Sequence, residues 1–181
     1  MEPPTLQTAR LVLRPYSLDD SADLARLAGA REVAATTLRI PHPYREQDAL
    51  DFIASSRADA ELGLSLRLAI TLRASGAFCG GIGLRMSPAH HRAELGYWLG
   101  LPYWGSGYAT EAAQALVRYG FQTLGLHRIY ASHVVGNVAS GRVLQKIGMH
   151  HEGCLRNHIC KWDQFLDLEF YGMLRSELPA Q

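Results

Sequence analysis

The chain has 181 residues, a formal net charge of +1 and a hydrophobic share of 48%. This length fits one domain, which we expect to span residues 1–181 and to fold without disulfides or metals. The near-neutral charge excludes the strongly basic surface of a general nucleic-acid-binding protein, and there is no acidic tail for a basic partner. No apolar run approaches the roughly 18 residues of a membrane span, so we expect no membrane insertion.

The cysteines and histidines give no metal-binding pattern. Cys79, Cys154 and Cys160 match no zinc-binding or CxxC spacing, and free thiols in a reducing cytosol are expected. The adjacent pairs at 90–91 and 150–151 place neighbouring histidines on opposite faces of a strand, which argues against metal ligation. The N-terminal segment is acidic and proline-rich without an apolar core, which predicts a cytoplasmic protein without a signal peptide.

The first half of the chain alternates strand and helix patterns. Residues 10–16 alternate in hydrophobicity as a strand does, and Ser17 offers a cap for a helix that reaches about Ala30. The proline-containing segment 36–44 is expected to be a loop, and residues 45–60 a second helix. Three strands then follow, with expected ranges 64–72, 77–85 and 91–99.

The second half predicts two strand–helix passages and a terminal pair of strands. The expected helices are 107–124 and 137–147, and the expected strands are 128–134, 150–156 and 165–175. The central strand–helix–strand unit predicts one parallel pair, whereas the hairpins predict antiparallel pairing. The fold class is therefore α+β, a mixed sheet of about seven strands with about four helices.

The segment 104–110, Trp-Gly-Ser-Gly-Tyr-Ala-Thr, carries the strongest functional signal. A helix begins inside it, and a helix N-terminus offers unpaired N–H groups and about half a positive charge. Gly105 and Gly107 let the backbone approach an anion, Ala109 keeps the first turn narrow, and Thr110 adds a hydroxyl. The segment thus predicts a phosphate site, with a plain glycine-rich turn as the alternative. It lacks the GK[ST] of a P-loop, and its GxGxxG pattern is incomplete.

This segment resembles the acetyl-CoA pyrophosphate loop of the GNAT N-acetyltransferase superfamily, whose pattern is Q/R-x-x-G-x-G/A. Trp104 stands where Gln or Arg is usual, and the following Thr-Glu-Ala resembles the RimJ/RimL-type branch. Further segments resemble that branch in the same order, so that the resemblance covers nearly the whole chain: 10–15, 127–140, 143–149 and 167–175.

The resemblance implies a GNAT-like fold in which strands 91–99 and 128–134 part into a V-shaped cleft. The pantetheine arm of acetyl-CoA would hydrogen-bond to the backbone of the first strand, as an added strand does. The coenzyme A-binding residues that it implies are Tyr97, Trp98, Leu99, Trp104, Gly105, Ser106, Gly107, Tyr108, Ala109, Thr110, Asn137, Ser140 and Arg142. Other roles stay open: core packing for Trp98 and Leu99, helix capping for Asn137, and a solvated helix face for Arg142.

The activity implied is transfer of the acetyl group of acetyl-CoA to a primary amine, on a protein N-terminus or a small molecule. The resemblance puts Ser140 near the thioester sulfur, where a hydroxyl can hydrogen-bond to the leaving thiolate. A plain serine near the helix N-terminus is the alternative for Ser140. Glu94 is the first candidate for the base that deprotonates the amine, with a surface or salt-bridged glutamate as the alternative. His158 is the second, because imidazole titrates near neutral pH, and Asp163 is the third. Segment 156–159 lacks the glutamate that some RimL-like enzymes carry there.

Two other functions stay open. A non-catalytic acyl-CoA-binding or regulatory module would keep the loop 104–109 and would not need Ser140 or Glu94. A nucleotide-binding domain of another kind is the third hypothesis. The resemblance also implies that segment 36–44 binds the acceptor and that a homodimer through the C-terminal strands is an option.

Overall fold

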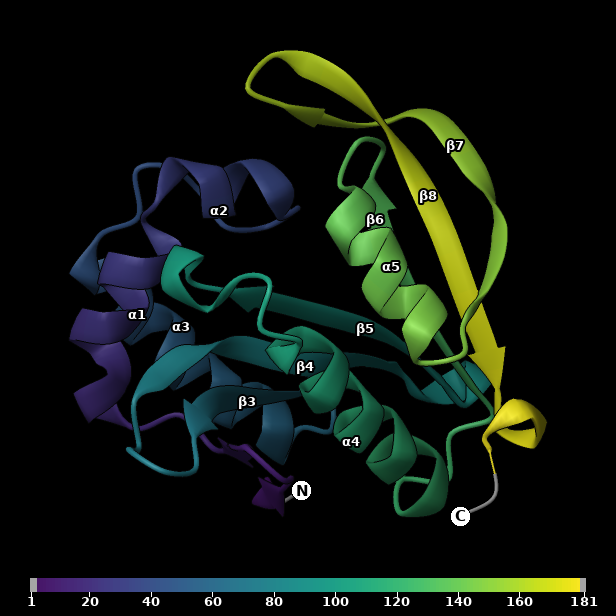
Figure 1. The fold of residues 1–181 in the computed structure, drawn as a ribbon, viewed down its shortest axis with the longest axis horizontal. Coiled ribbons are helices and arrows are strands. Elements are labelled where there is room, and N and C mark those ends of the chain that lie inside the picture. The colour runs from purple at the N-terminus through teal and green to yellow at the C-terminus, as the bar shows by residue number, and fades with distance from the viewer. Residues whose placement is uncertain (1–2, 180–181) are drawn as a thin grey trace.

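The computed structural model describes residues 3–179, so the two residues at each end of the expected domain lie outside the described residues. One mixed sheet of eight strands runs through them in the order β1-β2-β3-β4-β5-β6-β8-β7 (Figure 1). The strands are β1 Leu6–Gln7, β2 Leu11–Arg14, β3 Ser65–Leu72, β4 Phe78–Ser87, β5 Arg92–Leu99, β6 Arg128–Val134, β7 His150–Lys161 and β8 Gln164–Leu174. The helices are α1 Ser21–Ala28, α2 Arg31–Thr36, α3 Glu46–Glu61, α4 Tyr108–Gln122 and α5 Val138–Lys146.

Two helical layers bury opposite faces of the sheet. The larger cluster joins α4 and α5 to the strands through side chains such as Leu116, Phe121 and Leu144. The smaller cluster packs α1 and α3 against β3 and β4 through Leu24 and Ile53, among others. Within residues 3–179, none of the helices is both long enough and apolar enough to cross a bilayer.

The parallel strands β5 and β6 separate after a short paired stretch, whereas every other neighbouring pair is antiparallel. Their register runs from Arg92 opposite Arg128 to Glu94 opposite Tyr130. Beyond that point β5 continues to Leu99 paired with β4 alone, and β6 continues paired with β8. The sheet therefore opens between β5 and β6, and the expected V-shaped split is confirmed.

The predicted class and element order are confirmed, and three elements differ. The first helix ends at Ala28, and α2 follows as a separate helix because Ala30 is extended (φ −61°, ψ 129°) and interrupts it. Strand β1 was not expected, since a two-residue strand is too short for hydrophobic alternation to appear. Strand β7 extends well beyond residue 156, because β8 pairs with it up to Lys161.

Candidate active site

The turn before α4 leaves the N–H groups of the first helical turn without partners inside the helix. Gly105 (φ 73°) and Gly107 (φ 79°) adopt left-handed conformations that glycine enters at no steric cost, and Gly107 is the N-cap of α4. The first hydrogen bond of the helix runs from the Glu111 N–H to the Gly107 carbonyl at 3.1 Å, so the N–H groups of residues 108–110 precede it. The Trp104 indole donates to the Leu99 carbonyl at 2.7 Å and ties the turn to the end of β5. This geometry suits a diphosphate.

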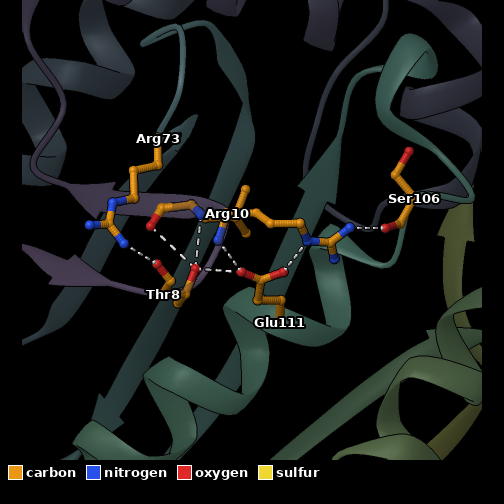
Figure 2. Close-up of polar contacts among 6 residues, drawn as sticks. Thr8, Arg10, Arg73, Ser106 and Glu111 are labelled. Atoms are coloured by element: carbon orange, nitrogen blue, oxygen red, sulfur yellow. Dashed lines mark hydrogen bonds and ion pairs between the residues drawn. The ribbon is translucent and has the colours of Figure 1, made fainter.

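Arg10, which directly precedes β2, binds the same turn (Figure 2). Its Nη1 donates to the Ser106 carbonyl at 2.9 Å, and its Nε donates to Glu111 on the first turn of α4 at 2.7 Å. The other Glu111 oxygen accepts from the Arg10 backbone N–H at 2.8 Å and from the Thr8 hydroxyl at 2.6 Å. The guanidinium carbon lies 4.6 Å from the centre of the Tyr108 ring. The loop is thus held partly by the β1–β2 turn, about a hundred residues away in sequence.

The N-terminus of α5 faces the loop across the split. The Asn137 side chain accepts a hydrogen bond from the Ser140 N–H at 3.2 Å, so Asn137 caps the helix. Its Nδ2 donates to the Thr36 carbonyl at 3.3 Å, which joins α5 to α2. The capping role left open by the sequence is therefore present, together with a link that the sequence did not reveal.

Tyr97 of β5 reaches across the split to α5. Its hydroxyl lies 2.8 Å from the Ser140 Oγ and 3.2 Å from the Ser140 carbonyl. Burial raises the pKa of Tyr97 to about 12, although the hydrogen bond with Ser140 acts in the opposite direction. At neutral pH the phenol is therefore protonated and can donate a hydrogen bond. The sequence suggested only a backbone role for Tyr97. The alternation of β5 indicates the face of the sheet that its side chain takes, but not that α5 lies beside it.

The opposite face of β5 carries Glu94, Gly96 and Trp98. Ala93, Leu95 and Leu99 are buried on the other face, as the two-residue repeat of a strand requires. A Cβ at Gly96 would meet no atom within 4 Å. There is thus open space between Glu94 and Trp98, on the face turned away from Tyr97.

Glu94 is held by two arginines. Its Oε2 accepts from Arg39 Nη2 at 2.9 Å and from Arg85 Nε at 3.1 Å, while only 13% of its side chain is exposed. Burial by itself raises the pKa of Glu94, but the hydrogen bonds and charges of the two arginines outweigh it and lower the pKa below its usual value. A carboxylate with a lowered pKa is a weaker base, which counts against Glu94 as the proton acceptor.

The β7–β8 hairpin arches toward α2 in Figure 1. Lys161, at the end of β7, donates hydrogen bonds to the carbonyls of Ala34 and Thr37. These contacts fasten α2 and the loop after it beside the split. Burial lowers the pKa of the Lys161 ammonium.

A cavity of about 800 Å³ occupies the split and unites most of the predicted residues. Those that line it are Glu94, Tyr97, Trp98, Leu99, Trp104, Gly105, Gly107, Tyr108, Ala109, Thr110, Asn137, Ser140 and Arg142. Ser106 lies outside the lining, where its carbonyl faces Arg10. His158 also lies outside, exposed on β7 with its ring 5.8 Å from that of Phe170. Sequence reasoning missed Arg39 and Arg85, which line the cavity from other segments.

Comparison with known proteins agrees with this geometry. Residues 10–150 match the family model described as Acetyltransferase (GNAT) domain, so the chain belongs to the GNAT acetyltransferase family. It is 32% identical over 174 residues to the uncharacterized N-acetyltransferase YnaD of Bacillus subtilis, covering 95% of this chain and 98% of that protein.

One curated relative and one solved structure support the RimJ/RimL-type branch. The ribosomal-protein-serine acetyltransferase of Escherichia coli is 32% identical over 90 residues, half of each chain. The structure of Mycobacterium smegmatis RimJ in complex with CoA-disulfide superposes with a TM-score of 0.84 at 25% identity, covering 94% of this chain and 84% of that one. The chain is therefore an acyltransferase with RimJ/RimL-like relatives.

Proposed function

We propose that the protein transfers the acetyl group of acetyl-CoA to a primary amine by direct attack in a ternary complex. The observation that carries this proposal is the Tyr97–Ser140 hydroxyl pair, 2.8 Å apart, beside the open turn at the N-terminus of α4. The turn would hold the diphosphate, and the unpaired part of β5 would pair with the pantetheine arm through its backbone. The YnaD likeness and the CoA complex of the RimJ relative support this arrangement.

Arg10 supports cofactor binding in this proposal. The GNAT loop pattern usually begins with Gln or Arg, but Trp104 occupies that position, and its indole is bonded to Leu99. Arg10 brings a guanidinium to the loop from the β1–β2 turn and donates a hydrogen bond to the Ser106 carbonyl. Arg142 and Lys146, both exposed on α5 and both lining the cavity, add positive charge for the phosphates of coenzyme A.

In the chemical step, the amine nitrogen attacks the thioester carbonyl carbon, and the carbon–sulfur bond breaks. Tyr97 or Ser140 donates a hydrogen bond to the departing sulfur. If the Tyr97 hydroxyl transfers its proton to the thiolate, the phenolate regains a proton from solvent, which also receives the proton that the attacking amine loses. Because the arginines depress the pKa of Glu94, we assign Glu94 to binding of the acceptor and leave proton removal to solvent. His158 and Asp163 stay predictions without a contact to the cavity, and the cytoplasm and a homodimer stay predictions as well.

Release of free CoA in the presence of amines tests the proposal. Wild-type protein is mixed with acetyl-CoA and a panel of peptides, amino acids and polyamines, and products are identified by mass spectrometry. We expect at least one amine to gain an acetyl group with matching release of CoA. Binding of acetyl-CoA without turnover on any amine would favour the non-catalytic acyl-CoA-binding or regulatory module.

A further inference from the structure

The face of β5 that carries Glu94, Gly96 and Trp98 is called the acceptor face, and the side chains beside it carry an excess of positive charge. Arg39 and Arg85 share the single carboxylate of Glu94, and their side chains are 61% and 57% exposed, compared with 13% for Glu94. Two guanidinium groups against one carboxylate leave a net charge of +1 at this place. Among the described residues that line the cavity, Glu94 is the one acidic side chain.

The neighbouring charges do not cancel this excess. Arg67 also lines the cavity, but it forms an ion pair with Asp59 at 2.6 Å and lies over the Phe52 ring, so that pair is neutral. Arg142 and Lys146 line the cavity from α5 and add positive charge. Because those two side chains are assigned to the phosphates of coenzyme A, the excess that a bound acceptor meets comes from Arg39 and Arg85.

The two arginines keep hydrogen-bonding capacity for a ligand. A guanidinium has five N–H donors in a planar fork that matches a carboxylate. Contacts within residues 3–179 use one donor of Arg39 and two of Arg85, and all of them go to Glu94 Oε2. The remaining donors belong to side chains that line the cavity beside the open space at Gly96.

We infer that the acceptor is an amine that carries a carboxylate a few bonds from the reacting nitrogen, as in an acidic amino acid or a peptide with an acidic residue near its N-terminus. This inference rests on the proposed function. The carboxylate would pair with Arg39 and Arg85, while the positive field lowers the pKa of the ammonium and favours the neutral amine that attacks. Polyamines meet repulsion at the same place.

Three peptides of equal length test the inference: Ala-Asp-Ala amide, Ala-Asn-Ala amide and Ala-Lys-Ala amide. With saturating acetyl-CoA, we expect kcat/KM to fall in that order, by about fivefold to tenfold for each unit of charge, and the preference to shrink as salt is added. Free aspartate and spermidine complete the panel. Aspartate used better than the peptide would identify an amino acid as the source of the carboxylate, and acetylation of the peptide alone would identify a polypeptide.

Arg39→Gln and Arg85→Gln should each reduce the preference for the acidic peptide severalfold and leave the KM for acetyl-CoA unchanged. Arg26→Gln is the matched control, because Arg26 is 61% exposed, pairs with Asp23 and lies outside the cavity lining. If the lysine peptide is used as well as the acidic peptide or better, the inference is overturned. If the preference for the acidic peptide survives both substitutions, the inference is overturned as well. The proposed function stands in either case. Absence of turnover on every acceptor overturns the proposed function itself.

Discussion

The two faces of β5 are built in different ways. On the face of Tyr97, a short run of consecutive residues, Gly105 to Thr110, provides the open turn, and glycine conformation with helix geometry accounts for most of it. On the face of Glu94, the side chains come from β4, β5 and the loop after α2, so only the folded chain brings them together. A binding site formed by backbone N–H groups depends on the conformation of the turn. A binding site formed by side chains from several segments can change its specificity by single substitutions.

Gly107→Glu should have the largest effect, because it tests the backbone-built face directly. A Cβ and a negative charge would enter the turn at a residue with φ 79°, and both oppose a diphosphate. We expect acetyl-CoA affinity to fall by roughly a hundredfold or more, measured as loss of the thermal shift and by titration calorimetry. Gly76→Glu is the matched control, since Gly76 has φ 75°, an open Cβ site and a place in the β3–β4 turn. If acetyl-CoA raised the melting temperature of Gly107→Glu as much as that of the wild type, the placement of the diphosphate would be contradicted.

Tyr97→Phe tests the chemical role on the same face. Loss of a proton donor to the leaving thiolate should lower kcat by roughly a hundredfold, with little change in the KM for acetyl-CoA. Ser140→Ala should lower kcat by less, because the phenol remains. Tyr119→Phe serves as control, since Tyr119 is half-buried on α4 and outside the cavity lining. Equal turnover in wild type and both variants would remove the hydroxyl pair from the mechanism.

Gly96→Val tests whether the second face receives the acceptor. Valine suits a strand, and its Cβ has room, so the melting temperature should hold or rise. The added methyl groups narrow the space between Glu94 and Trp98 and would displace the amine from the thioester. We therefore expect kcat/KM for the amine to fall about tenfold. Gly96→Ala should give an intermediate value. A valine variant with full activity on every amine would show that the acceptor enters elsewhere.

Arg10→Gln should have the smallest effect, because Arg10 is half-exposed and contacts the loop through a hydrogen bond to the Ser106 carbonyl. We expect the KM for acetyl-CoA to rise about fivefold, in the range of one exposed charged hydrogen bond, while kcat stays near wild type. Arg10→Lys should recover part of the loss. Arg73→Gln is the control, because Arg73 contacts the same β1–β2 turn through the Thr8 carbonyl at 3.4 Å but does not reach the loop. A fall in kcat with no change in KM would contradict the positioning role.

The sequence by itself determined the order of elements, the mixed sheet and the open turn at Gly105 and Gly107. These features follow from periodicity and glycine conformation, which act over a few residues. It also indicated that Asn137 begins a helix, because capping is a local hydrogen bond. The short strand β1 and the separate helix α2 were not predicted, because a two-residue strand shows no alternation and the extended Ala30 carries no clear breaking signal in the sequence.

Only the tertiary structure decided how the site is charged and which hydroxyls meet. Tyr97 and Ser140 are 43 residues apart, and Arg39 lies 55 residues from Glu94, so no spacing in the chain signals either contact. The pKa of Glu94 likewise depends on which cations the fold brings beside it. Hydrophobic patterning acts over a few residues and therefore predicts the strands and helices. Ion pairs and hydrogen bonds need atoms within a few ångströms of each other, and that proximity arises only when the sheet and its helices have packed.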